Sequence, residues 1–76
     1  MSHRDLVKDA ILTVLATRRL NLLAHRKAFQ RLYFQLRADG MGGRQARAVV
    51  KKARRAVPGL REEPKGLNVA LDLILA

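Results

Sequence analysis

Apolar residues recur three and four positions apart along the first part of the chain. This spacing predicts a helix over residues 3–19 with one broad apolar face. Ser2 precedes the run and is expected to cap its free amides, while Asp5 stands where it completes a capping box. The predicted apolar face consists of Leu6, Val7, Ala10, Ile11, Val14 and Leu15.

A second helical pattern covers residues 22–38. Most of its apolar residues fall within an arc of about 100° and should face the core. Leu23 and Phe34 lie apart from that arc, nearly in line with each other, and predict a second contact surface. His25 stands at the edge of the apolar face, where we expect a packed, hydrogen-bonded histidine. Gly40 is expected to end the helix in the left-handed conformation. The core-facing set is Leu22, His25, Phe29, Leu32, Tyr33 and Leu36.

The third helical pattern, over residues 43–57, separates charge from apolar surface. Six cations occupy one arc of about 160°, and only Ala and Val occupy the opposite arc. Such a helix should pack closely against its neighbour through the small residues and present the cations to solvent. Pro58 and Gly59 end it, because proline disfavours the helical conformation of the preceding residue. The cations are Arg44, Arg47, Lys51, Lys52, Arg54 and Arg55.

The last ten residues are almost entirely apolar and fit either a helix or an alternating strand. Leu and Ala favour a short helix over residues 66–76, and the chain offers no second strand to pair with. Only Asn68 and Asp72 are polar, on one face, so the rest should be buried in the core or against another chain. The candidate protein-interface residues are Leu23, Phe34, Leu71, Leu73, Ile74 and Leu75.

These patterns predict a single all-α domain over residues 1–76, a bundle of three main helices with a short C-terminal helix. Seventy-six residues leave little core to spare, which argues against an enclosed active site. Cysteine is absent, and His3 and His25 stand 22 positions apart without carboxylates at metal-ligand spacing. We therefore expect no enzyme activity, no metal and no cofactor. No signal peptide or spanning segment is recognised, so a cytoplasmic protein is expected.

The net charge of +10 is concentrated in the middle of the chain. Residues 18–55 contain twelve basic residues and one acid, Asp39, while the two ends nearly cancel. Six cations without an acid on one helix repel one another, which makes them a poor device for solubility alone. The pattern favours an anionic partner, and phosphate contacts give affinity through counterion release.

Residues 32–50 loosely resemble a helix-turn-helix motif, with a glycine in the turn and Arg44, Gln45, Arg47 and Ala48 opening the second helix. The first helix is longer, and the turn richer in glycine, than in that motif. We predict a small phage or bacterial nucleic-acid-binding regulator, for example of transcription. The six cations of residues 43–57 would contact phosphates, Gln45 a base edge, and Arg26, Lys27 and Arg31 would widen the footprint. Phe29, Tyr33 and Phe34 are candidates for stacking on bases, and their spacing favours core packing for the first two.

The alternative is a small phage-type inhibitor or adaptor that binds an acidic groove on a larger host protein. Its cations would meet the groove, and Leu23, Phe34 or residues 67–76 would supply the buried anchors. The small core also favours a homodimer through the C-terminal segment. Interfacial membrane binding ranks last, because the apolar face of residues 43–57 lacks Trp, Phe and Leu.

Overall fold

A computed structural model of the chain describes residues 2–17, 22–60 and 64–76. Every regular element in these residues is helical, which confirms the predicted all-α fold. The elements are α1 (His3–Ala16), α2 (Leu22–Ala38), α3 (Gly43–Ala56), the 3₁₀ turn η1 (Val57–Gly59) and α4 (Pro64–Leu75). The expected ends of the first helix at residues 18–19, and the side chain of Leu22, lie outside the described part.

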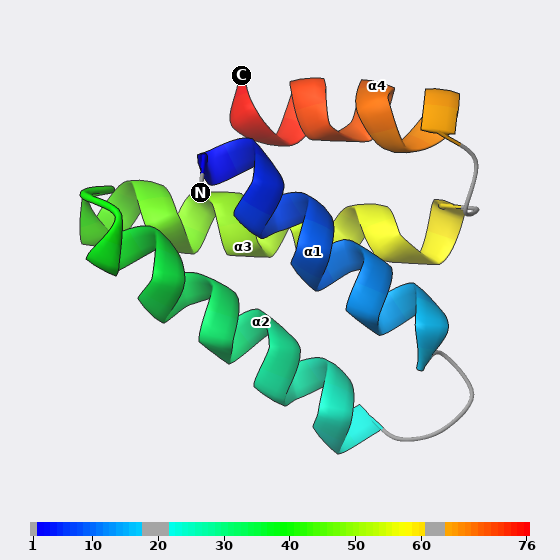
Figure 1. Cartoon of the computed structure of the whole chain (residues 1–76), viewed down its shortest axis with the longest axis horizontal. Coiled ribbons are helices and arrows are strands. Elements are labelled where there is room, and N and C mark those ends of the chain that lie inside the picture. Colours follow the sequence, from blue (N-terminus) through cyan, green and yellow to red (C-terminus); the bar gives the residue numbers. More distant parts are fainter. Residues whose placement is uncertain (1, 18–21, 61–63) are drawn as a thin grey trace.

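Two helices form the centre of the bundle. α1 and α3 each contact the other three helices, and among the described residues α2 and α4 do not contact one another. Figure 1 shows α1 and α2 side by side and antiparallel, with α3 crossing behind α1 and α4 returning antiparallel to α3. α3 is therefore held from three sides, and only its remaining face is left to solvent.

The core follows the predicted periodicity. All six residues of the α1 apolar face are buried. From α2 the core takes Phe29, Leu32 and Leu36, whereas Tyr33 is only half-buried. Most of the small residues on the predicted apolar side of α3 are buried, whereas Val50 and Ala56 are only partly buried. The buried residues of α3 and η1 are Ala46, Val49, Ala53 and Val57.

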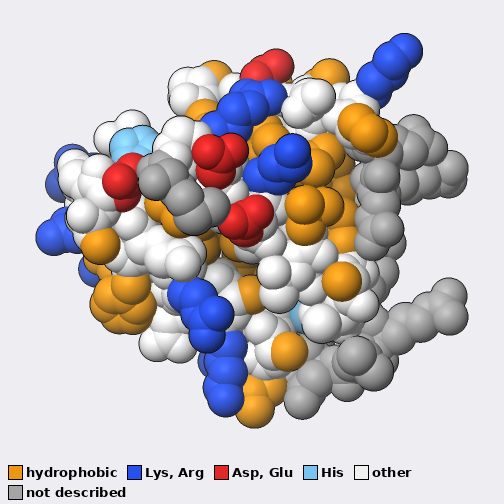
Figure 2. All heavy atoms as spheres, in the orientation of Figure 1, with side chains coloured by type: hydrophobic (Ala, Val, Ile, Leu, Met, Phe, Trp, Pro, Cys, Tyr) orange, Lys and Arg blue, Asp and Glu red, His pale blue; other side chains and the backbone are white. Residues whose placement is uncertain are grey.

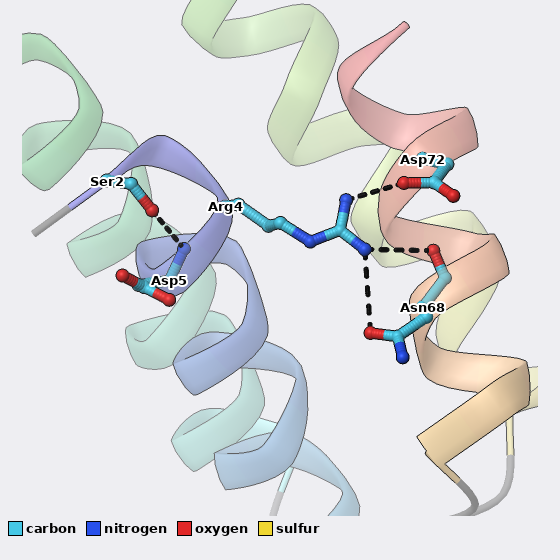
Figure 3. A network of polar contacts seen from close by, with 5 residues as sticks. All are labelled: Ser2, Arg4, Asp5, Asn68 and Asp72. Atoms are coloured by element: carbon cyan, nitrogen blue, oxygen red, sulfur yellow. Dashed lines mark hydrogen bonds and ion pairs between the residues drawn. The ribbon is translucent and has the colours of Figure 1, made fainter.

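The predicted caps are present. The Ser2 hydroxyl accepts a hydrogen bond of 3.1 Å from the Asp5 amide (Figure 3). Gly40 has φ of +98°, the left-handed conformation expected of it. Its amide donates to Arg37 O, and the Met41 amide donates to Leu36 O, which together close the end of α2 as a Schellman motif.

The boundaries of three helices differ from the prediction. α1 ends at Ala16 rather than at residue 19, with Thr17 as its C-cap. α3 ends at Ala56, because Val57 begins the 3₁₀ turn that contains Pro58. α4 begins at Pro64, two residues earlier than expected, and ends at Leu75. A proline fits the first turn of a helix, where its missing N–H has no partner to lose. Residues 64 and 65 are thus the first turn of α4 rather than part of a connector.

Asn68 and Asp72 of α4 face α1. Arg4 extends from α1 and donates to Asp72 Oδ1 at 2.6 Å and to Asn68 O at 3.3 Å (Figure 3). Arg4 binds the polar side of α4, and the apolar side chains of α4 point partly into the core and partly to solvent. Leu71 and Ile74 are buried against the bundle, whereas Leu73 is 68% exposed. The expectation that α4 buries nearly all its apolar surface is therefore not met within one chain.

Candidate nucleic-acid interface

α3 presents all six of its cations to solvent. We call this surface the cationic face: Arg44, Arg47, Lys51, Lys52, Arg54 and Arg55, each exposed. The residues on the opposite side of the helix are buried, so the cations cannot turn inward. Gln45, proposed for a base edge, is exposed beside them. The structure thus brings together the seven α3 residues of the predicted site.

The centre of the cationic face is elongated along the helix axis. Arg44, Lys51 and Arg55 lie along one line of the helix, and the α-helical rise places the first and last about 16 Å apart. Ala48 is exposed between them, and its small side chain lets a flat ligand approach the helix. A duplex carries one phosphate charge per about 1.7 Å of its axis, so this length spans several phosphates.

The start of α3 adds positive potential to the same surface. Gly42 caps the helix without a side-chain hydrogen bond, and no acid stands in the first turn to offset the helix dipole. The Arg37 guanidinium lies against this turn: a Cβ atom placed on Gly43 would be only 2.6 Å from Arg37 Nη1. Sequence reasoning missed Arg37 as a site residue. Its place in the last turn of α2, directly before the glycine-rich turn, was the available signal.

A groove runs between α2 and α3 along one edge of the cationic face. It has a volume of about 580 Å³, and we call it the aromatic groove because all three aromatic residues of the chain line it. Val50 adds to its apolar lining, and Gln30 supplies a neutral polar group. Arg47, Lys51 and Arg54 of the cationic face also line it. The groove therefore joins aromatic and cationic surface in one place.

The three aromatic side chains differ in exposure. Phe29 is buried, as predicted, and the Arg54 guanidinium lies over its ring at 5.3 Å from the centroid. Tyr33 is half-buried and meets Phe34 edge to face, with 5.3 Å between ring centroids and 73° between planes. Phe34 is 60% exposed. An apolar ring that solvent reaches, held by a second ring, is the part of the groove open to a ligand.

The cations of α2 divide between two sides of that helix. Arg26 stands four residues before Gln30, and therefore on the side that faces the aromatic groove. Lys27 and Arg31 instead line a groove between α1 and α2, together with Asp9. Lys27 and Arg31 also line a second shallow groove with Gln30 and Phe34. The structure thus keeps Arg26 beside the aromatic groove and places Lys27 and Arg31 between Phe34 and the side of α2 that faces α1.

Acidic side chains gather on another face. Figure 2 shows them together over the N-terminal part of α1 and the neighbouring part of α4, the face behind which α3 passes in Figure 1. On this face Asp72 pairs with Arg4, and Asp39 Oδ2 lies 3.2 Å from His3 Nε2. Cations on α1 and α4 balance the acids of those two helices, so the excess positive charge of the described residues lies on α2 and α3.

The candidate protein-interface residues are scattered. Leu71 and Ile74 lie in the core, because their side of α4 faces the bundle, and so they offer no surface to a partner. Leu75 packs partly against the core. Leu23 and Leu73 are exposed on different helices. Val69, 60% exposed beside Leu73, was not predicted, although its alternation with Leu71 and Leu73 in the sequence was the available signal.

Most of the side chains that could act in catalysis already make hydrogen bonds within the described part of the molecule. The Thr13 and Thr17 hydroxyls each donate to a backbone carbonyl of α1, at 2.8 Å. His25 Nε2 lies 2.9 Å from Thr17 O, and since a carbonyl only accepts, this nitrogen carries the proton. The described residues contain no cluster of three or more potential metal ligands. None of the helices described is long and apolar enough to cross a membrane.

Comparison with models of known families, with curated protein sequences and with solved structures finds no match for this chain. Function is therefore inferred from the geometry and charge of the molecule itself.

Proposed function

We propose that this protein is a small, non-catalytic nucleic-acid-binding regulator of phage or bacterial origin, acting in the cytoplasm. The observation that carries the proposal is the cationic face, six exposed cations on one side of a helix that has no acid. Each phosphate that these cations neutralise releases condensed counterions, and this supplies affinity without any requirement for sequence. The distribution of charge supports the same orientation, because the excess of cations lies on α2 and α3 while charges balance on α1 and α4.

The order of α2, a four-residue turn and α3 supports a reading related to the helix-turn-helix motif. In that motif the N-terminal residues of the second helix contact base edges. Arg44, Gln45 and Arg47 are exposed at this position in α3. Gln45 is the proposed base-reading residue, since an amide can bond an adenine edge bidentately, and the arginines would hold the register on phosphates.

Charge reversal tests the proposal. Lys51→Glu with Arg55→Glu removes two proposed phosphate contacts and should weaken binding to a generic duplex at low salt about a hundred-fold, or about ten-fold for each charged contact. Lys8→Glu with Lys65→Glu is the matched control, because both residues are exposed on other helices and the net charge falls by the same four units. Affinities are measured by fluorescence anisotropy. Affinity weaker than micromolar in the wild type, or equal effects of the two double variants, would overturn the proposal.

The exposed apolar residues favour a second candidate function, an inhibitor or adaptor that docks on an acidic groove of a host protein. Phe34 and Leu73 are the anchors this reading needs. A pull-down from nuclease-treated bacterial lysate discriminates the two. One stoichiometric protein partner that survives nuclease, and is lost in Leu73→Glu, would favour this function. A partner that disappears with nuclease was bridged by nucleic acid.

We also propose that α4 joins two copies of the chain. Val69 and Leu73 are the exposed residues on its outer side, next to a groove of about 440 Å³ between α3 and α4. Pairing two such surfaces would enlarge the small core. Light scattering at high micromolar concentration should give the mass of a dimer for the wild type and of a monomer for Leu73→Glu. A monomeric wild type would exclude this interface.

A further inference from the structure

The aromatic groove holds all three aromatic residues of a chain that has none elsewhere. Core packing explains Phe29, which is buried, but it does not explain Phe34, which is 60% exposed. A single exposed phenylalanine is common on a protein surface. Phe34 differs because it forms one contiguous surface with Tyr33 and Val50, in a groove that opens beside the cationic face.

The charged residues that line the aromatic groove limit which ligands it can bind. Arg47, Lys51 and Arg54 line it, and no acidic side chain does so among the described residues. An occupant must therefore join planar or apolar surface to negative charge. A nucleotide does so within one unit, since its base has a π-face and its phosphates flank the base on both sides.

The size of the aromatic groove favours a nucleotide over an acidic helix as its ligand. A volume of about 580 Å³ lies in the range of pockets that take one small ligand. A docked amphipathic helix needs a row of anchors along several turns. The lining residues span 29–34 of α2 and 47–54 of α3, at most about two turns of each helix, and the cations continue along α3 beyond them. This arrangement suits one or two bases next to a longer run of phosphates.

We propose that the aromatic groove stacks an unpaired base on Phe34 while the cationic face holds the adjoining phosphates, so that the protein prefers single-stranded to duplex nucleic acid. The inference rests on the proposed nucleic-acid function and adds the strand state of the ligand. In a duplex the π-faces of the bases are covered by their neighbours, so the protein can contact phosphates and base edges but cannot stack on a base. Stacking on an aromatic side chain is tolerant of sequence, because every base has a π-face. Tyr33 positions the Phe34 ring through their edge-to-face contact.

The test compares a single-stranded oligothymidylate with a DNA duplex of equal length. Phe34→Ala should weaken binding of the single strand by about five- to a hundred-fold, the range for losing one stacked base, and change duplex binding less than about two-fold. Leu23→Ala is the matched control, since Leu23 is 52% exposed on the same helix and does not line the groove. It should change neither affinity. Phe34 is exposed, so removal of its ring should leave the fold intact, which circular dichroism checks.

A second variant gives a direct signal. The chain has no tryptophan, so Phe34→Trp places a unique fluorophore in the groove. This variant should retain single-strand affinity, and its indole emission should be quenched by oligothymidylate and much less by the duplex. Equal effects of Phe34→Ala on both ligands, or indole emission that stays unquenched while the single strand is bound, would overturn the inference while leaving the proposed function standing. Displacement of the single strand by polyglutamate at equal charge concentration would point to an acidic protein partner and would also overturn it. Failure to bind either DNA ligand would instead remove the proposed function itself.

Discussion

Gly40 and Gly66 differ in backbone conformation. Gly40 has φ of +98° at the end of α2, where its left-handed backbone allows the Schellman hydrogen bonds. Gly66 lies within α4 and has no positive φ. A Cβ atom added at either position would meet nothing within 4 Å. Any difference between the two substitutions therefore comes from backbone conformation alone.

Gly40→Ala should lower the free energy of unfolding by about 1–2 kcal/mol, because a Cβ atom is strained in the left-handed region. Gly66→Ala should raise it by about 0.5–1 kcal/mol, because alanine loses less backbone entropy in a helix. Urea titration followed by circular dichroism measures both. Two changes of the same sign would contradict the backbone assignment at Gly40.

Arg4 connects the two ends of the chain across α1 and α4. Its guanidinium makes a charged contact with Asp72 and a second hydrogen bond to the backbone of Asn68, although both charged side chains are substantially exposed. Arg4→Ala should therefore cost only about 1 kcal/mol at low salt, and less when salt screens the pair. Lys8→Ala is the control, an exposed cation on the same helix outside this network. A loss at Arg4 that salt does not reduce would show that its packing, rather than its charge, stabilises α4.

At the scale of elements, α4 divides into a structural side and an exposed side. Leu71 is fully buried, whereas Leu73, two residues later, is 68% exposed. Leu71→Ala should cost about 2–5 kcal/mol, because it leaves a cavity between helices. Leu73→Ala should change the stability of the monomer by less than about 0.5 kcal/mol. Thermal unfolding at low protein concentration compares them. Similar losses from both would mean that α4 packs in another register.

The helices and caps could be predicted from local pattern, because the spacing of apolar residues within α1 and within α3 already indicates which side of each helix is buried. α4 could not be fully predicted, because its sequence is apolar on nearly all sides. Which side turns inward depends on contacts with the other helices, namely the packing of Leu67, Leu71 and Ile74 and the bonds from Arg4 to Asp72 and Asn68. The site shows the same division. The cationic face follows from the period of α3 alone, whereas the aromatic groove and the place of Arg37 depend on how α2 lies against α3.

In the whole molecule, the net charge of +10 is concentrated on α2 and α3 rather than spread over the surface. The packing of α3 on α1 and α2 fixes its apolar side inward, so its cations must share one outward surface. On α1 and α4 the acids Asp5, Asp9 and Asp72 are balanced by the cations Arg4, Lys8 and Lys65, and Figure 2 shows acids and cations mixed on that face. A polyanion should therefore meet this protein in a defined orientation, with α3 and the adjoining edge of α2 against it.

The salt dependence of binding to a generic duplex tests this central claim most directly. If the cationic face contacts four to six phosphates, the logarithm of the binding constant should fall with the logarithm of salt concentration with a slope of about −4 to −5. Lys51→Glu with Arg55→Glu should reduce that slope by about two, since each lost phosphate contact removes about one. Lys8→Glu with Lys65→Glu should leave the slope nearly unchanged. A slope near zero in the wild type, or the same reduction in both double variants, would contradict the account.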